Sequence, residues 1–283
     1  MLVRTMRKNK YNAIICICII LILLLSGLSD STVFAKEDDK KDYGVFLSLD
    51  ASDLDKIAKY QTVVIDAQYF SKKDIAYLKK HGCTVYSYLN VGSIENFRKY
   101  YNTYEKLTLG EYENWEEEKW MDVSQVKWQK FLASLEKGLI IKGIDGFFVD
   151  NCDVYYEYTT DDIFVGLTTI LKHLMKYQKP VIINGGDAFV MEYKERYGRL
   201  TDIMTGVNQE SVWSRIDFDT GKFSVQKKSD RNYFMKYVET CDSQGLDVYL
   251  LEYTKSKTLK SKIKKYCRQK HFHYYISDSI ELD

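Results

Sequence analysis

The sequence predicts an α/β fold, a single (β/α)8 TIM barrel, from two features of residues 43–283. Eight short β-rich segments alternate with helical patterns, and such a repeated unit forms a parallel sheet that can close on itself. Most of these segments are continuous apolar runs, such as VVID, GFFVD and VYLLEY, which are typical of strands covered on both faces. An open doubly wound sheet is the alternative, but the ASDLDK sequence after the first strand lacks a glycine-rich phosphate-binding turn.

The predicted strands and helices follow one another along the chain. Strands are expected at residues 43–50, 62–69, 83–91, 143–150, 180–186, 202–209, 246–253 and 272–277. Helices are expected at residues 72–82, 124–138, 160–177 and 229–245. The first ends at Gly82, and the second begins at Ser124 and ends at Gly138, which are preferred residues at helix ends. The third has apolar residues at helical spacing, and the fourth runs from a Ser-Asp cap to a glycine.

Residues 92–123 form a long insertion between the third and fourth predicted strands. The insertion is rich in Tyr, Trp and Glu. Long loops in compact domains are often the lids or walls of binding sites, although an ordinary surface excursion is the alternative.

The N-terminus has the order of a secretory signal. A basic flank is followed by an apolar run over residues 13–25 and by Val33-Phe34-Ala35, which fits cleavage after Ala35. We therefore expect a signal peptide at residues 1–35, a solvated linker at 36–42 and the barrel at 43–283. An uncleaved anchor, with a membrane tether through residues 13–28, is the alternative, so the barrel is expected outside the cell or on the outer face of the membrane.

Charge and cysteine content exclude some function classes. The 283-residue chain has a net charge of +1, which gives no reason to expect nucleic acid as a partner. Residues 1–35 hold four of the 41 basic and one of the 40 acidic side chains, which leaves 37 and 39 and a net charge of about −2. The four remaining cysteines have no CxxC spacing and are expected to be mostly free and buried, or to form at most one bridge.

Acidic residues lie at the C-terminal ends of several predicted strands, where barrel enzymes carry their active sites. These residues are Asp50, Asp66, Asp150, Asp153, Glu210 and Glu252. Asp150 ends the fourth strand and Glu210 follows the sixth, and alternate strands contribute to the same interior layer. The two carboxylates can therefore face each other, as glycoside hydrolysis requires. The alternative is that such acids cap helices or bind loop backbone.

Aromatic residues near the same strand ends could stack on sugar rings, or could simply pack in the core or rim. They are Tyr69, Tyr88, Tyr155, Tyr156, Trp213 and Tyr253. The four histidines lack HExxH spacing, so no metal site is expected. The sequence also has no GxSxG elbow, no P-loop and no GxGxxG motif.

Three sequence blocks carry a resemblance to a known family: residues 85–101 (VYSYLNVGSIENFRKYY), 116–124 (EEEKWMDVS) and 143–156 (GIDGFFVDNCDVYY). With INGGDAF, GVNQESVW and VYLLEYT further on, they resemble family 114 glycoside hydrolases, which are endo-α-1,4-polygalactosaminidases and relatives with a (β/α)8 barrel. The resemblance spans residues 43–278. Some relatives carry Gly-Glu at Gly92-Ser93 and Asn-Glu-Gln at residues 208–210, which leaves the register of Glu210 open by one residue.

The resemblance implies a monomeric, secreted hydrolase of a galactosamine-containing exopolysaccharide that needs no cofactor. Asp150 matches the family's acid after the fourth strand and is expected to be the nucleophile or electrostatic partner; Glu210 is expected to be the proton donor, with the reverse assignment open. The candidate substrate-binding residues are Asp50, Asp66, Tyr88, Asn90, Asn151, Asp153, Tyr155, Asn184, Trp213, Glu252 and Tyr253. Two alternatives remain: a non-catalytic carbohydrate- or cell-wall-binding barrel, and a hydrolase of a different polysaccharide.

Overall fold

The computed structural model describes residues 40–113 and 115–283. The predicted signal peptide or anchor and most of the predicted linker lie outside these residues. Within the described ranges, no helix is long and apolar enough to cross a membrane.

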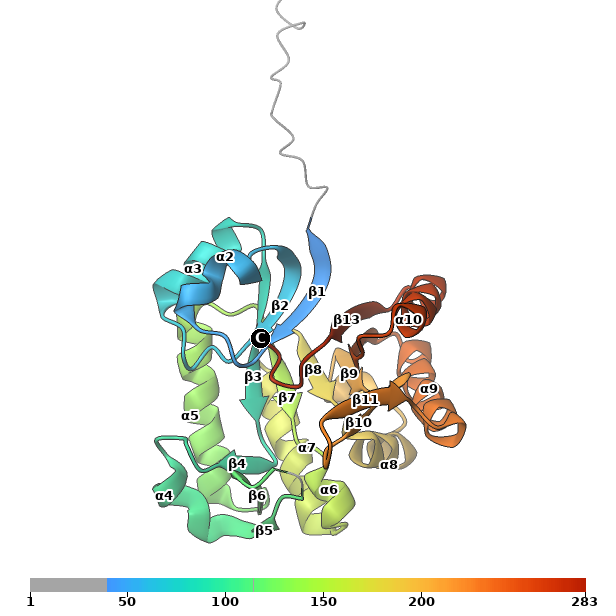
Figure 1. Ribbon diagram of the computed structural model, residues 1–283. Coiled ribbons are helices and arrows are strands. Elements are labelled where there is room, and N and C mark those ends of the chain that lie inside the picture. The colour runs from blue at the N-terminus through green and yellow to red at the C-terminus, as the bar shows by residue number, and fades with distance from the viewer. Residues whose placement is uncertain (1–39, 114) are drawn as a thin grey trace, which may run out of the picture. The chain divides into compact units, whose positions relative to one another are not determined.

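Eight parallel strands form the centre of the fold and follow one another around the sheet in sequence order (Figure 1). They are β1 (Lys41–Phe46), β2 (Tyr60–Ile65), β3 (Thr84–Asn90), β7 (Gly146–Asp150), β8 (Val181–Asn184), β9 (Gly206–Glu210), β12 (Asp247–Tyr253) and β13 (His273–Ser277). Each predicted strand is present, although β1 begins two residues before the predicted start of the barrel at residue 43. An open doubly wound sheet would reverse its strand order, so that alternative is excluded.

The first and last strands meet and nearly close the barrel. The rings of Phe46 on β1 and Tyr275 on β13 lie 5.6 Å apart, centroid to centroid. The Nδ1 atom of His273 lies 2.7 Å from Oδ2 of Asp42. The fold is therefore the predicted (β/α)8 barrel.

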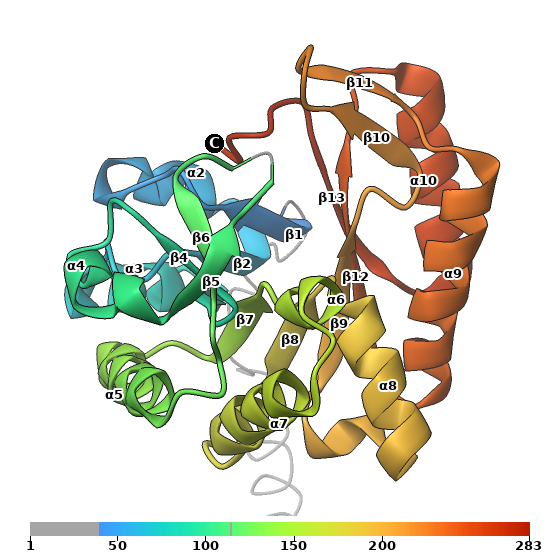
Figure 2. The same cartoon turned by 90° about the horizontal axis from the view of Figure 1, so that it is seen from below.

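Helices form an outer ring around the strands (Figure 2). They are α2 (Leu54–Ile57), α3 (Lys72–Lys80), α5 (Val126–Lys142), α6 (Val154–Glu157), α7 (Asp161–Met175), α8 (Asp187–Tyr197), α9 (Lys228–Ser243) and α10 (Lys257–Lys270). The predicted helix end at Gly138 is wrong. The helix α5 continues through Gly138 and ends at Gly143, which has a left-handed φ of 100°.

Alternating side chains of each strand pack on two different faces. Phe147 and Val149 on β7 face the surrounding helices, whereas Phe148 between them faces the barrel interior. The interior is largely aromatic and contains Tyr43, Tyr86, Tyr88, Phe148, Tyr249 and Tyr253. Because both faces are buried, the strands read as continuous apolar runs in the sequence.

Two smaller sheets follow barrel strands β3 and β9 (Figure 2). The insertion at residues 92–123 folds into β4 (Ser93–Glu95), α4 (Tyr101–Tyr104), β5 (Thr108–Glu111) and β6 (Glu118–Met121), with strand order β4-β6-β5. The strands β10 (Ser214–Asp217) and β11 (Lys222–Val225) form an antiparallel hairpin. The predicted long loop is therefore an ordered subdomain.

Candidate active site

A cavity of about 470 Å³ opens where the C-terminal ends of the barrel strands meet. Its wall also contains residues of the insertion, of the β10–β11 hairpin and of the C-terminal segment. The strand-end residues in the wall are Asp66, Tyr88, Asp150, Asn184, Glu210 and Tyr253.

The carboxylates of Asp150 and Glu210 converge on one side chain between them. The Nδ2 atom of Asn184 donates to Oδ1 of Asp150 over 2.9 Å and to Oε1 of Glu210 over 2.8 Å. The two oxygens therefore lie no further apart than the sum of these distances, 5.7 Å. Glu210, and not its neighbour Gln209, makes this contact.

Further hydrogen bonds fix the orientation of this group. The Oδ1 atom of Asn184 accepts from Nδ2 of Asn208 over 2.7 Å, and Oδ1 of Asn208 accepts from the hydroxyl of Tyr43 over 3.2 Å. These contacts set which end of the Asn184 amide points at the carboxylates. On the other side, the hydroxyl of Tyr253 donates to Oε2 of Glu210 over 2.6 Å.

Burial changes the acidity of both carboxyl groups. Removal from water and the nearby charge of Glu210 raise the pKa of Asp150 to about 6. Burial also raises the pKa of Glu210, against the hydrogen bonds from Tyr253 and Asn184, which favour its ionised form. Raised carboxyl pKa values allow such a pair to hold one proton near neutral pH, as an acid and a nucleophile require.

The loop after Asp150 depends on a close backbone approach. Asn151 adopts a left-handed φ of 65°, and its Nδ2 atom donates to Oδ1 of Asn90 and to Oγ of Ser93, both over 3.0 Å. A Cβ atom at Gly92 would lie only 1.7 Å from the carbonyl oxygen of Asn151. A glycine at position 92 is therefore required for the chain to turn beside Asp150.

Asp153 adds a further acid to the cavity wall. Its carboxylate accepts from the backbone nitrogen of Gly186 over 3.2 Å. Burial, followed by the charges of Asp187 and Asp150, raises the pKa of Asp153 to about 7.

Six of the eleven candidate substrate-binding residues line the cavity: Asp66, Tyr88, Asn151, Asp153, Asn184 and Tyr253. The other five, Asp50, Asn90, Tyr155, Trp213 and Glu252, lie outside its wall.

Two of these five are acids with structural contacts. The strand β1 ends at Phe46, so Asp50 lies beyond it and accepts from the backbone nitrogen of Ser52 over 2.8 Å. Glu252 is fully buried and accepts from the backbone nitrogens of Trp213 and Ser214 over 2.9 and 2.8 Å. Burial raises the pKa of Glu252 to about 7. Its contacts hold the turn between β9 and β10.

The remaining three have packing or bridging contacts. Tyr155 lies against Phe164, with ring centroids 5.7 Å apart, and Trp213 lies 5.4 Å from the ring of Tyr266. Asn90 accepts from the backbone nitrogen of Ser93 over 2.9 Å and so supports the turn into the insertion.

The insertion supplies wall residues that the sequence did not identify. Arg98 is buried and forms ion pairs with Asp66 over 2.5 Å and with Glu95 over 2.7 Å. Glu118 accepts from the hydroxyl of Ser93. Burial and the charge of Glu95 raise the pKa of Glu118 to about 7. Tyr112, Phe97 and Trp115 complete this side of the wall.

The sequence signal for these residues was weak. The insertion is rich in Tyr, Trp and Glu, which marks it as a possible wall, but no local pattern pairs Arg98 with a strand end 32 residues earlier. Within residues 40–113 and 115–283, no group of three or more His, Cys, Asp or Glu side chains is arranged to hold a metal ion.

Comparisons with known proteins agree with this architecture. The glycoside hydrolase domain of PelA from Pseudomonas aeruginosa superposes with a TM-score of 0.73 at 18% identity, covering 86% of this chain and 96% of that domain. Ega3 from Aspergillus fumigatus, in complex with galactosamine, gives a TM-score of 0.65 at 16% identity, covering 87% and 92%. At such identities the likeness shows the fold. A search of curated proteins gives no match.

The family follows from the sequence itself. A model of glycoside-hydrolase family GH114 matches residues 31–279, which is most of the chain. The resemblance found in the sequence motifs is thereby confirmed. The chain belongs to glycoside-hydrolase family GH114 and is a glycoside hydrolase.

Proposed function

We propose that this chain is a secreted hydrolase that cleaves internal α-1,4 linkages of a galactosamine-containing polysaccharide, with Asp150 and Glu210 as its two catalytic carboxylates. The observation that carries the proposal is the pair of carboxylates that Asn184 holds within 5.7 Å of each other inside an acidic cavity. Membership of the family and the galactosamine bound by Ega3 support the choice of sugar.

The separation of the carboxylates supports a retaining mechanism. Retaining glycosidases hold their carboxyl groups about 5–5.5 Å apart, whereas inverting enzymes leave about 6.5–9.5 Å for a water molecule. In the proposed first step, Asp150 attacks the anomeric carbon while Glu210 protonates the departing glycosidic oxygen. In the second step, Glu210 takes a proton from water, and the water oxygen displaces Asp150 from the sugar.

The charge of the cavity wall supports a cationic substrate. Asp66, Glu95, Glu117, Glu118 and Asp153 contribute carboxyl groups, and Arg98 is tied to two of them. Carboxylates that face an ammonium group attract it and favour its charged form. A deacetylated galactosamine unit would therefore bind this wall better than its acetylated, neutral counterpart.

A panel of purified exopolysaccharides, with product analysis by mass spectrometry, tests the substrate. We expect short galactosamine oligomers from the deacetylated α-1,4 polymer and slower release from the fully acetylated polymer. Equal rates would remove the charge argument. Cleavage of another polymer alone would favour a hydrolase of a different polysaccharide.

An inactive variant separates catalysis from binding. Asp150→Asn keeps the shape of the side chain, so we expect it to bind the polymer without cleaving it. If wild type binds amino-sugar polymers but cleaves none, the chain is a carbohydrate-binding barrel instead. N-terminal sequencing of the protein from culture medium tests secretion, and a mature end at Lys36 is the expected result.

A further inference from the structure

The helix α10 carries a strongly basic surface far in character from the acidic cavity. Residues 255–270 contain seven lysines and one arginine and no acidic residue. The buried face of the helix is formed by Leu259, Ile263, Tyr266 and Cys267. All of its basic side chains therefore project from the remaining surface.

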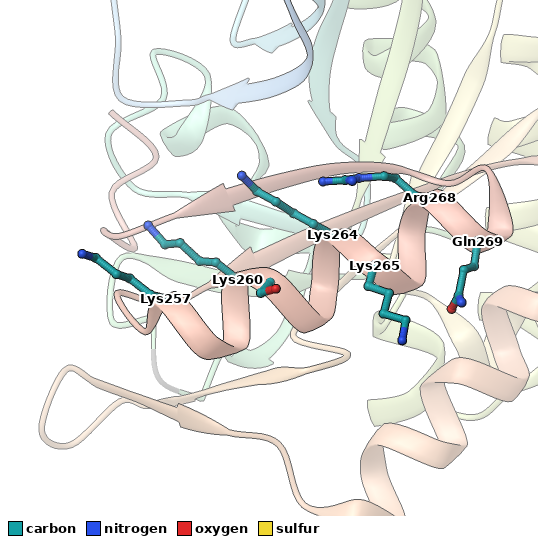
Figure 3. A pocket seen from close by; sticks show the side chains of 7 residues that line it. Lys257, Lys260, Lys264, Lys265, Arg268 and Gln269 are labelled. Atoms are coloured by element: carbon teal, nitrogen blue, oxygen red, sulfur yellow. The ribbon is translucent and has the colours of Figure 1, made fainter.

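Four of these cations form a row along the helix. Lys257, Lys260, Lys264 and Arg268 are spaced three and four residues apart, which places them on one face at successive turns. Figure 3 shows these four side chains extending to the same side of α10, whereas Lys265 and Gln269 point the other way. At a rise of 1.5 Å per residue, the row is about 16 Å long.

The row has no charge partner within the part of the chain that the structure describes. The one ion pair found on α10 joins Lys270, outside the row, to Glu239. Like charges four residues apart repel each other, and Lys257 lies in the first turn, where the helix dipole disfavours a cation. The arrangement therefore weakens the helix, and an external anion would relieve the repulsion.

The chemistry of the row indicates which anion fits. The hollow along α10, about 510 Å³, is lined by Lys, Arg, Ser and Gln side chains alone. It offers no apolar side chain to insert into a membrane and no aromatic ring on which nucleic-acid bases could stack. Three of the four cations are lysines, which bind phosphate as point charges, whereas planar carboxylates favour arginine.

We propose that the row formed by Lys257, Lys260, Lys264 and Arg268 binds a linear polyol chain joined by phosphodiesters. Successive phosphates pair with successive cations along the helix. This site shares no residue with the catalytic cavity, and its charge repels a cationic polysaccharide. The enzyme thus holds an anionic polymer on one surface while its acidic cavity remains open.

Binding of the full chain to purified poly(glycerol phosphate) tests the proposal. The test variant replaces the four row cations with glutamine: Lys257→Gln, Lys260→Gln, Lys264→Gln and Arg268→Gln. A matched control removes four exposed lysines from α3 and α5: Lys72→Gln, Lys73→Gln, Lys80→Gln and Lys137→Gln. Both variants lose the same charge, and thermal melts followed by circular dichroism verify that both are folded.

We expect the row variant to bind at least about tenfold more weakly than wild type, and the control to bind within about twofold. Binding by wild type should also weaken as salt is raised. Equal loss in both variants, or no loss in the row variant, would overturn the proposal. Tighter binding of wild type to poly(dT), polygalacturonate or anionic vesicles than to poly(glycerol phosphate) would overturn the choice of ligand. Hydrolysis by the row variant is expected to be unchanged, so this test is independent of the catalytic assignment.

Discussion

Oδ1 of Asp150 and Oε1 of Glu210 lie within 5.7 Å of each other at the ends of two barrel strands, β7 and β9. A gap of this size leaves room for an anomeric carbon but not for an additional water molecule between base and sugar. We therefore expect the first product of α-1,4 cleavage to be the α anomer. Proton NMR during the first minutes of digestion measures this, and initial formation of the β anomer would exclude Asp150 as a nucleophile.

Asn184 is expected to be a positioning residue for both carboxylates. Asn184→Ala removes the nitrogen that both acids share, so kcat should fall about 100-fold, since misplacement of about 1 Å has that effect on catalysis. Steady-state kinetics on the deacetylated polymer provide the measurement. A kcat within about twofold of wild type, in a variant with an unchanged melting temperature, would show that the bridge has no role in positioning.

The pH dependence of hydrolysis should follow the two carboxyl groups. Asp150 must be ionised to attack, so activity should rise with pH through about 6, the raised pKa of this group. Glu210 must be protonated, so activity should fall again once it ionises. The hydroxyl of Tyr253 lowers the pKa of Glu210, and Tyr253→Phe should therefore move the falling limb of the kcat profile to higher pH. A shift to lower pH would contradict the assignment of Glu210 as the acid.

Gly92 is expected to tolerate no side chain. In Gly92→Ala, the new methyl group must displace the backbone of Asn151, next to Asp150. We expect a loss of at least about 1 kcal/mol in the free energy of unfolding together with a large loss of kcat. Gly138→Ala is the matched control, because a Cβ atom at this helical position meets nothing within 4 Å and should be neutral or stabilising. Equal effects of the two changes would show that the close approach is not required.

Buried acids should make the protein less stable at alkaline pH. Burial raises the pKa of Asp153 from 3.8 to about 7, so its protonated form is favoured in the folded state. The stability that this group contributes is fully present below pH 3.8 and is lost as the pH rises through about 7. The melting temperature should therefore fall between pH 5 and pH 8, by less in Asp153→Asn than in wild type. A variant with the same pH dependence as wild type would contradict this role of burial.

The barrel could be predicted from sequence because its strands are covered on both faces. Runs such as Phe147-Phe148-Val149 alternate between the helices and the interior, so both kinds of position are apolar. The helices α8 and α10 were not predicted. The exposed face of α10 is filled with lysines, and only four buried residues mark its periodicity.

The candidate site could be predicted only where a side chain follows a strand directly. Asp150, Asn184 and Glu210 end their strands and meet in the cavity. Asp50 was placed at a strand end because VFLSLD continues an apolar pattern, but β1 ends at Phe46. Contacts made by the insertion, such as that of Arg98 with Asp66, join residues whose proximity depends on tertiary structure, which local patterns do not contain.

Cleavage of the deacetylated α-1,4 galactosamine polymer by wild type, Asp150→Asn and Glu210→Gln, followed as reducing ends released over time, tests the two-carboxylate mechanism most directly. The mechanism predicts rapid internal cleavage by wild type and rates at least about 1,000-fold lower for each folded, polymer-binding variant. Turnover by either variant at a rate comparable to wild type would contradict it.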